Sequence, residues 1–244
     1  MCTGVYDPAA MAAAPSDTHA LLTIVRHGQT SANVDGVWHG SINTPLTDHG
    51  RRQAAAVGSH IEANYRPVAH VYASHLDRAH HTAQAIADPL GLTPAIESDL
   101  AEYHLGDWEG MSFQRLHEEK QLFQNMRVDP HFAPHGGETP LEVGLRLAGA
   151  LRSIAERHPG ERVVVVSHGG ALGIAFGVLL DDDYSRFDRM MKNCAISELS
   201  FAPRPELVTF NQIDHLPPEA PPSPSRSETD GASGAANSSG APKQ

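Results

Sequence analysis

Three short segments of this chain carry side chains suited to holding and attacking a phosphoryl group. They are Arg26-His27-Gly28, Ser74-His75-Leu76-Asp77-Arg78 and Ser167-His168-Gly169-Gly170. Arginine stays charged at any relevant pH and pairs with phosphate through two parallel hydrogen bonds. Arg26 and Arg78 are therefore candidates to hold a phosphoryl dianion and to offset the charge of its transition state.

His27 lies beside one of these arginines and is the candidate nucleophile. A neutral imidazole attacks phosphorus through one ring nitrogen, and nearby guanidinium groups keep the ring neutral by disfavouring imidazolium. The other ring nitrogen needs an acceptor that fixes the tautomer, a role suited to a backbone carbonyl. Gly28 would let the chain turn tightly and bring backbone amides close to the anion.

A proton must also reach the leaving alkoxide. Glu102 is the candidate general acid, which would then act as a base toward water in a second step. This role requires surroundings that keep its carboxyl group protonated until the leaving group needs the proton. Asp107 and Glu109 are rival carboxylates in the same segment, and spacing alone does not exclude them.

Each of the three segments follows a short apolar run that predicts a strand. The runs cover residues 21–25, 70–73 and 162–166. The last contains four consecutive valines, as expected for a strand that is buried on both faces.

Three helices are predicted along the chain, over residues 51–62, 77–87 and 139–157. The third has apolar residues at helical spacing, which are Leu141, Leu145, Leu147, Leu151 and Ile154. His158-Pro159-Gly160 then ends this helix, because proline and glycine do not continue it.

Strands that alternate with helices predict an α/β fold. The expected architecture is a three-layer sandwich, with a mostly parallel sheet and helices on both faces. Ligands of such sheets bind beyond the carboxyl ends of the strands. Two histidines and two arginines should therefore meet at one edge of the sheet.

The folded region is predicted to be one domain, residues 20–215. The chain has 244 residues and is 40% hydrophobic, which suffices for one well-buried core. Residues 1–19 are Ala-rich without a clear period and are predicted to form a flexible leader. Residues 216–244 are rich in Pro, Ser, Gly and Ala and are predicted to be a disordered tail.

Composition argues against several classes of protein. The net charge of -11 disfavours nonspecific nucleic-acid binding, although it allows a small basic pocket. No apolar run reaches the length of a membrane span, and no Lys or Arg precedes Arg26 as in a secretory signal. The protein is thus predicted to be cytoplasmic, with neither a membrane nor a nucleic acid as partner.

Neither disulfides nor metals are expected. Cys2 and Cys194 are the two cysteines, and Cys194 is predicted to be a buried thiol. No His-Glu-x-x-His or Cys/His metal-binding spacing is present. The sequence therefore predicts neither a metal nor another cofactor.

Five ordered motifs resemble those of the histidine phosphatase superfamily, in the branch that includes cofactor-dependent phosphoglycerate mutases and many small-molecule phosphatases. They are IVRHGQTSAN, NTPLTDHGRRQA, ASHLDRAHHTAQA, Glu102 ahead of GDWEG, and VVVSHGG. The resemblance spans about residues 21–200. Because several motifs match in order, it is far more specific than a lone Arg-His-Gly.

The resemblance implies a role for each matched residue. His27 would be the phosphorylated nucleophile, His168 a phosphate ligand and electrostatic stabiliser, and Glu102 the proton donor. The substrate-binding residues would be Arg26, Asn33, Arg78, His39, Gly40 and Gly169. It also implies that extra helical segments form a small cap over the pocket.

Two departures from the family bear on the reaction. The family often has Gln-Gly where this chain has His39-Gly40, so the side chain that would bind substrate at position 39 differs from the family's. The tryptophan-rich stretch and the long middle insertion of phosphoglycerate mutases are missing. GDWEG and Gly136-Gly137-Glu138-Thr139 instead resemble the phosphatase members.

The preferred prediction is a metal-independent phosphomonoesterase that hydrolyses small phosphorylated metabolites through a phosphohistidine on His27. Its partner would be a small-molecule phosphate ester, and the sequence does not specify an oligomeric state. Two alternatives remain open. One is phosphotransfer of the phosphoglycerate mutase type, and the other is a non-catalytic module that binds a phosphorylated ligand.

Overall fold

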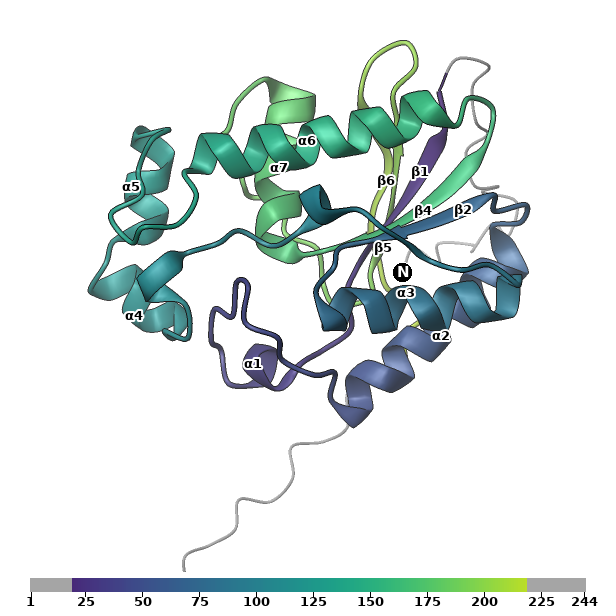
Figure 1. Ribbon diagram of the computed structural model, residues 1–244, viewed down its shortest axis with the longest axis horizontal. Coiled ribbons are helices and arrows are strands. Elements are labelled where there is room, and N and C mark those ends of the chain that lie inside the picture. Colours follow the sequence, from purple (N-terminus) through teal and green to yellow (C-terminus); the bar gives the residue numbers. More distant parts are fainter. Residues whose placement is uncertain (1–18, 219–244) are drawn as a thin grey trace, which may run out of the picture.

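The computed structural model describes residues 19–218, which form six strands and the helices around them (Figure 1). The rest of the predicted leader and tail lies outside these residues. The strands are β1 (Leu21–Arg26), β2 (His70–Ala73), β3 (Ala95–Ile96), β4 (Arg162–Ser167), β5 (Ile196–Ser200) and β6 (Glu206–Gln212). Their order in the sheet is β3-β2-β4-β1-β5-β6. The first four are parallel, and β5 and β6 are antiparallel.

Two pairs of helices cover the two faces of the sheet (Figure 1). Helices α2 (Asp48–Asn64) and α3 (Asp77–Leu90) lie on one face, and α6 (Pro140–Arg157) and α7 (Gly169–Asp181) lie on the other. The predicted sandwich of three layers is thus confirmed. The described residues contain no helix that is both long and apolar enough to cross a bilayer.

The valines of β4 supply both cores in alternation. Val163 and Val165 pack with α6 and α7, whereas Val164 and Val166 pack with α2 and α3. All six residues of β4 are buried, because it is a central strand with a parallel partner on each side. The central strands therefore hold the residues that follow them in a rigid setting.

The three predicted strands occur where expected, but the boundaries of the predicted helices differ. Helix α2 begins at Asp48 rather than at residue 51, because Thr47 caps it by accepting a hydrogen bond from the Gly50 amide. Helix α3 continues past residue 87 to Leu90 and contains Pro89 in its last turn, and Gly91 ends it in the left-handed conformation.

The prediction that Leu145 belongs to the buried face of α6 was wrong. Leu147, Leu151 and Ile154 of α6 are buried, but Leu145 is 55% exposed. Leu145 precedes Leu147 by two residues, which turns it to about the opposite side of the helix. Thr139 is the N-cap of α6, and its side chain and that of Glu142 form a capping box.

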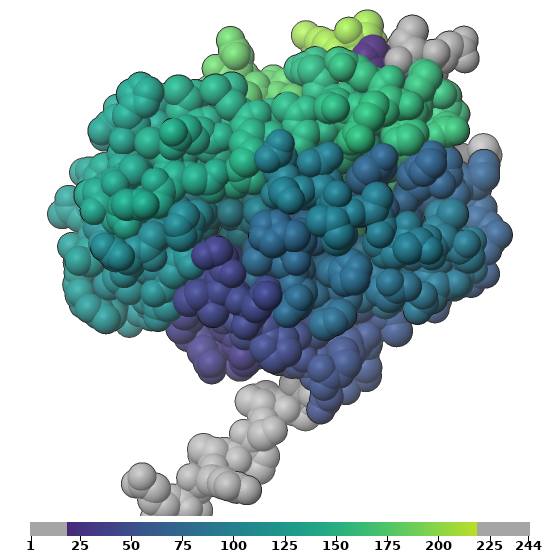
Figure 2. Space-filling model, viewed as in Figure 1, coloured from purple at the N-terminus to yellow at the C-terminus, as the bar shows by residue number. Residues whose placement is uncertain are grey.

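Short helices join these layers near the carboxyl ends of the strands. They are α1 (Ser31–Val34), α4 (Phe113–Glu118) and α5 (Leu122–Val128), with 3₁₀ turns η1 (Ser98–Leu100) and η2 (Gly106–Trp108). In the space-filling view, the purple segment after β1 lies between the teal α4–α5 region and the blue helices (Figure 2). This arrangement fits the small helical cap that the resemblance implies.

The antiparallel strands β5 and β6 were not anticipated from the sequence. Strand β5 pairs with β1 on the side opposite to β4. The residues just before β5 therefore lie beside the end of β1, next to His27. Leu216, the first residue of the predicted tail, packs against the core on the α2 and α3 side.

Candidate active site

The residues that follow β1, β2 and β4 meet at one edge of the sheet, as predicted. The His27 amide donates to the carbonyl of Ser167 at 3.0 Å, which places the ends of β1 and β4 side by side. The ring centroids of His27 and His168 are 5.1 Å apart. Both rings and the side chain of Arg78 are fully buried. Segments distant in the chain therefore form a single cluster of imidazole and guanidinium groups.

The ring of His27 is oriented by the residue that follows it. Its Nδ1 lies 2.8 Å from the carbonyl oxygen of Gly28, which accepts only if Nδ1 carries the proton. The Nε2 atom then bears the lone pair, and it is buried without a hydrogen-bond partner among residues 19–218. Burial, followed by the charges of Arg78 and Arg26, holds the pKa of His27 well below its usual value. His27 is therefore neutral and has the attacking tautomer.

His168 has the opposite tautomer. The Nε atom of Arg78 donates to Nδ1 of His168 at 3.2 Å, so the ring proton of neutral His168 lies on Nε2. That Nε2 is also buried without a partner in the described part of the chain. Burial and then the charge of Arg78 lower the pKa of His168 well below its ordinary value. One ring thus presents a lone pair and the other presents a donor.

Arg78 is held by backbone carbonyls of the segment after β1. Its Nη1 donates to Ile42 at 2.9 Å and its Nη2 to Gly40 at 2.6 Å. Gly40 has a φ of +47°, and an added Cβ there would overlap the Glu109 carboxylate. Burial lowers the pKa of Arg78 to about 10, so this guanidinium remains charged at neutral pH. Gly40 therefore holds Arg78 through its carbonyl and allows the tight turn of this segment.

Arg26 is bonded to the segment that precedes β5. Its Nη1 donates to the carbonyl of Met191 at 2.6 Å, and its Nε is buried without a partner in residues 19–218. An added Cβ on Gly169 would come within 3.0 Å of the guanidinium. Glycine at the start of α7 therefore leaves room for Arg26, which explains the predicted place of Gly169 in the site.

His39 is a third buried imidazole and lies beside the nucleophile. Its ring is edge-on to His27 at a centroid separation of 5.7 Å. Burial, with smaller contributions from Arg78 and Arg26, lowers the pKa of His39 to about 3. Its Nδ1 has no hydrogen-bond partner among the described residues. His39 thus lines the cluster instead of lying on a surface loop.

Asn33 and a residue missed by the sequence analysis are linked. The Oδ1 of Asn33 accepts from the Thr30 amide at 3.0 Å, which caps α1. The Nδ2 of Asn193 donates to the same Oδ1 at 3.1 Å and to the carbonyl of His27 at 2.9 Å. The bonds of Asn33 to other described residues leave its Nδ2 donor unused. Asn193 was missed because no local pattern predicted strand β5, which positions it.

Glu102 lies at the N-terminus of α7. Its carboxylate accepts backbone N–H bonds from Tyr103 at 2.9 Å, from Gly170 at 3.2 Å and from Ala171 at 2.7 Å. Its charge opposes the effect of burial, which lowers the pKa of Arg26 and of Arg78. Glu102 is thus close to both guanidinium groups. All three bonds use the carboxylate as an acceptor and fix its orientation beside the start of α7. Its role as proton donor stays a prediction.

The two rival carboxylates differ from Glu102 in their surroundings. Asp107 is exposed at η2. Glu109 accepts from the Ser41 amide and hydroxyl at 2.9 and 2.7 Å, and it lies 2.7 Å from Nδ1 of His104. Although burial raises the pKa of Glu109, these hydrogen bonds lower it below its usual value. Glu109 is therefore positioned to hold the segment that contains Gly40.

The cluster has the polar atoms of an anion site. Four buried atoms lack a partner within residues 19–218, namely Arg26 Nε, His27 Nε2, His39 Nδ1 and His168 Nε2. Buried polar atoms are normally paired, so a group of four points to a polar ligand. Two charged guanidiniums and three neutral rings favour an anion with several acceptor oxygens, such as a phosphate ester.

Comparisons with known proteins agree with this chemistry. The family model described as the histidine phosphatase superfamily (branch 1) matches residues 22–213. The probable phosphoglycerate mutase GpmB of Cronobacter sakazakii is 31% identical over 204 residues, which cover 79% of this chain and 93% of the relative. A metal-independent phosphoserine phosphatase of Arabidopsis thaliana is 38% identical over 156 residues, or 62% of this chain and 65% of that protein.

A solved structure is similar over nearly its whole length. It is a mycobacterial glucosyl-3-phosphoglycerate phosphatase in complex with VO3, with 30% sequence identity and a TM-score of 0.69. The match covers 79% of this chain and 98% of the other. The fold described above is therefore shared with a phosphatase.

Proposed function

This chain belongs to the histidine phosphatase superfamily, and we propose that it hydrolyses small phosphate monoesters through a phosphohistidine on His27. The opposite tautomers of His27 and His168 are the observation that carries this proposal. The Nε2 lone pair of neutral His27 belongs to the same buried cluster as His168 and two arginines, which can bind the phosphoryl oxygens. Such an arrangement suits nucleophilic attack on phosphorus.

The reaction has two displacements. In the first, Nε2 of His27 attacks phosphorus, the bond from phosphorus to the ester oxygen breaks, and a carboxyl proton goes to the departing alkoxide. In the second, water attacks phosphorus and gives one proton to the carboxylate, while the bond from phosphorus to Nε2 breaks. This step releases inorganic phosphate and restores neutral His27. Both displacements pass through a transition state that Arg26, Arg78 and His168 stabilise.

Glu102 is the proposed carrier of that proton. It lies near both arginines, whereas Asp107 is exposed and Glu109 is held by Ser41 and His104. Three backbone amides orient the carboxylate, and as general acid Glu102 would supply the proton that an alkoxide needs to leave. Its contribution should therefore depend strongly on the leaving group.

Hydrolysis is a better-supported reaction than mutase-type phosphotransfer. Relatives whose names describe phosphatases include a metal-independent phosphoserine phosphatase and a glucosyl-3-phosphoglycerate phosphatase. Their names suggest that the substrate here is a phosphorylated metabolite with a carboxylate or sugar, and we propose that class. A non-catalytic module has less support, because His27 is neutral and its Nε2 makes no hydrogen bond within the part of the chain that the structure describes.

A substrate panel in the presence of EDTA tests the function. Full-length protein and a His27→Ala variant are assayed between pH 5 and 8 with phosphoserine, 3-phosphoglycerate, glucosyl-3-phosphoglycerate and sugar phosphates. We expect inorganic phosphate from at least one ester, and a loss of about 10³-fold or more in the variant. Transfer of phosphate between positions of one substrate, with little release, would instead establish the mutase alternative.

Trapping of the intermediate separates catalysis from binding. After brief exposure to a labelled substrate, acid-labile phosphate should appear on His27. Tight phosphate binding without this label would favour the non-catalytic module.

The cytoplasmic location and the absence of nucleic-acid and membrane partners stay predictions, which fractionation of cells and pull-down of partners can test.

A further inference from the structure

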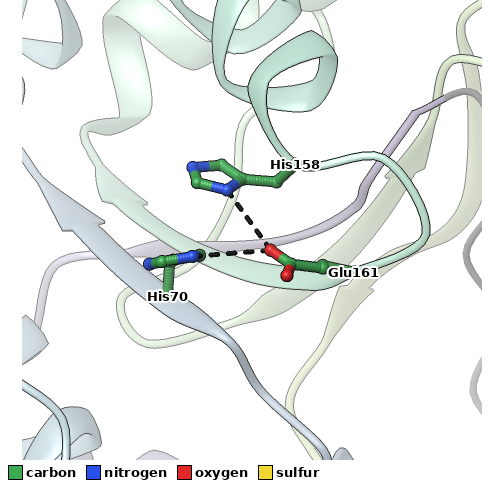
Figure 3. Close-up of side chains that lie close together, drawn as sticks. All are labelled: His70, His158 and Glu161. Atoms are coloured by element: carbon green, nitrogen blue, oxygen red, sulfur yellow. Dashed lines mark ion pairs between the residues drawn. The ribbon is translucent and has the colours of Figure 1, made fainter.

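A second cluster of ligand-type side chains lies at the opposite edge of the sheet from His27. His70 is the first residue of β2, Glu161 directly precedes β4, and His158 follows the end of α6. Figure 3 shows both imidazoles directed toward one carboxylate. Among residues 19–218, this is the one group of three His, Cys, Asp or Glu side chains with ligand atoms all within 4.8 Å of one another.

The distances within this cluster match the edges of a coordination tetrahedron. Glu161 Oε2 is 3.4 Å from Nε2 of His70 and 3.3 Å from Nδ1 of His158. Ligand atoms 2.0–2.1 Å from a tetrahedral zinc ion are separated from each other by about 3.3–3.4 Å. Two of the three ligand-to-ligand distances therefore already have the required length.

The contacts of Glu161 Oε2 do not have the geometry of hydrogen bonds. Glu161 Oε2 is buried, yet it has no hydrogen-bond partner among the described residues despite the two nearby ring nitrogens. An ordinary His–Glu pair would point an N–H at the oxygen. In a coordination sphere, the donor lone pairs point at the ion and not at each other. Close approach without hydrogen-bond alignment is thus expected of metal ligands.

Tyr72 supports one of the two rings from behind. Its hydroxyl oxygen is 2.9 Å from Nε2 of His158, the nitrogen that faces away from Glu161. When Nε2 donates to this hydroxyl, the lone pair of His158 lies on Nδ1, which faces the cluster. The ring centroids of His70 and His158 are 4.0 Å apart, and the ligand atoms of the cluster all lie within 4.8 Å of one another.

We propose that His70, His158 and Glu161 bind a divalent transition-metal ion, with zinc as the favoured ion and solvent as its fourth ligand. Two imidazole nitrogens and one carboxylate oxygen form a ligand set that suits zinc. His70 is half exposed, which leaves a path for the ion and for a water ligand. The ion would connect the start of β2 with the loop between α6 and β4.

The proposed ion would act on stability and take no part in phosphoryl transfer. The six residues of β4 separate Glu161 from His168, and a strand of that length spans about 20 Å. An ion that binds the folded chain but not the unfolded chain raises the melting temperature by mass action. This inference does not depend on the proposed function, since a phosphatase that works in EDTA is compatible with it.

Zinc binding to the full chain tests the proposal. Tag-free protein is treated with EDTA, dialysed and titrated with ZnCl₂ by calorimetry, while its melting temperature is followed in parallel. We expect one ion per chain and a zinc-dependent rise in melting temperature. His70→Ala and Glu161→Gln should each weaken binding by about tenfold or more, and Tyr72→Phe by about tenfold.

Two controls locate the ion. A His80→Ala/His81→Ala variant, which removes a histidine pair from α3, should bind zinc like the parent chain. His27→Ala should also bind normally, because the active-site imidazoles are not part of the proposed site. Loss of binding in His27→Ala, or unchanged affinity in both His70→Ala and Glu161→Gln, would overturn the proposal. Circular dichroism checks that each variant is folded.

Discussion

Arg78 Nε donates to Nδ1 of His168, and this one hydrogen bond decides which nitrogen of His168 carries a proton. The carbonyl of Gly28 makes the opposite choice for His27. The two rings are 5.1 Å apart and have complementary roles, because one offers a lone pair and the other an N–H group. Arg78 therefore acts on the reaction both by its charge and by orienting His168.

Replacement of Arg78 by lysine separates these two contributions. Arg78→Lys keeps a positive charge but loses the bidentate fork and the donor to His168. We expect kcat/KM to fall by about 10²-fold or more in steady-state assays with the best substrate of the panel. Arg51→Lys is the matched control, since Arg51 is exposed on α2. Near-normal activity of Arg78→Lys would mean that charge alone suffices.

Glu102 and Glu109 can be distinguished by the leaving group. Glu102→Gln removes the proposed acid, so kcat for an alkyl phosphate should fall by about 10²–10⁴-fold. Hydrolysis of p-nitrophenyl phosphate should suffer far less, because nitrophenolate leaves without a proton. Glu109→Gln should change both substrates by a similar factor, as expected of a residue that positions Ser41. A leaving-group effect in Glu109→Gln alone would transfer the acid role to that residue.

A substitution at Gly40 tests how the segment after β1 holds Arg78. Gly40→Ala would force a side chain against the Glu109 carboxylate and shift the carbonyl that accepts from Arg78 Nη2. Gly91→Ala is the matched control, because Gly91 also has positive φ but an added Cβ there would meet nothing within 4 Å. Gly91→Ala should lose about 1 kcal/mol of stability in urea unfolding. Gly40→Ala should lose more stability than this and should also lower kcat/KM.

The buried histidines make stability depend on pH in a defined direction. His39 has a folded-state pKa of about 3, far below its ordinary value near 6.5, so between these values the unfolded chain binds more protons. Stability is therefore greatest above that ordinary value and falls as the pH drops toward 3. Each such imidazole contributes a slope of about 1.4 kcal/mol per pH unit.

His39→Gln tests that direction. Urea unfolding of the parent chain and the variant between pH 6 and 4.5 should show a shallower pH dependence for the variant, by about the slope of one imidazole. His81→Gln is a matched control, because His81 is exposed on α3. Equal slopes for the parent chain and His39→Gln would show that His39 titrates normally in the folded state.

Much of this site could be predicted from the sequence, because its residues directly follow strands that the sequence predicts. The runs before Arg26, Ser74 and His168 were apolar enough to predict strands, and parallel strands align their carboxyl ends. The local pattern therefore sufficed to bring His27, Arg78 and His168 together. Their roles in turnover stay predictions until the variants are measured.

Other features depend on contacts that no local pattern encodes. The short strands β3 and β5 lack a clear signature, so the partner of Asn33 could not be found. The placement of Glu102 at the start of α7 arises from tertiary packing of a loop against a helix end. The cluster of His70, His158 and Glu161 joins the start of β2 to the loop between α6 and β4, and its spacing fits no short motif.

The segment before β5 gives the site a dependence on the order of synthesis. Met191 accepts from Arg26, Asn193 donates to the carbonyl of His27, and the Cys194 amide donates to the carbonyl of Arg26. A ribosome releases His27 long before it makes these residues. A nascent chain that stops short of them should therefore carry the nucleophile but lack its fixed orientation, and we expect it to remain unphosphorylated until residues 191–194 have been made and folded.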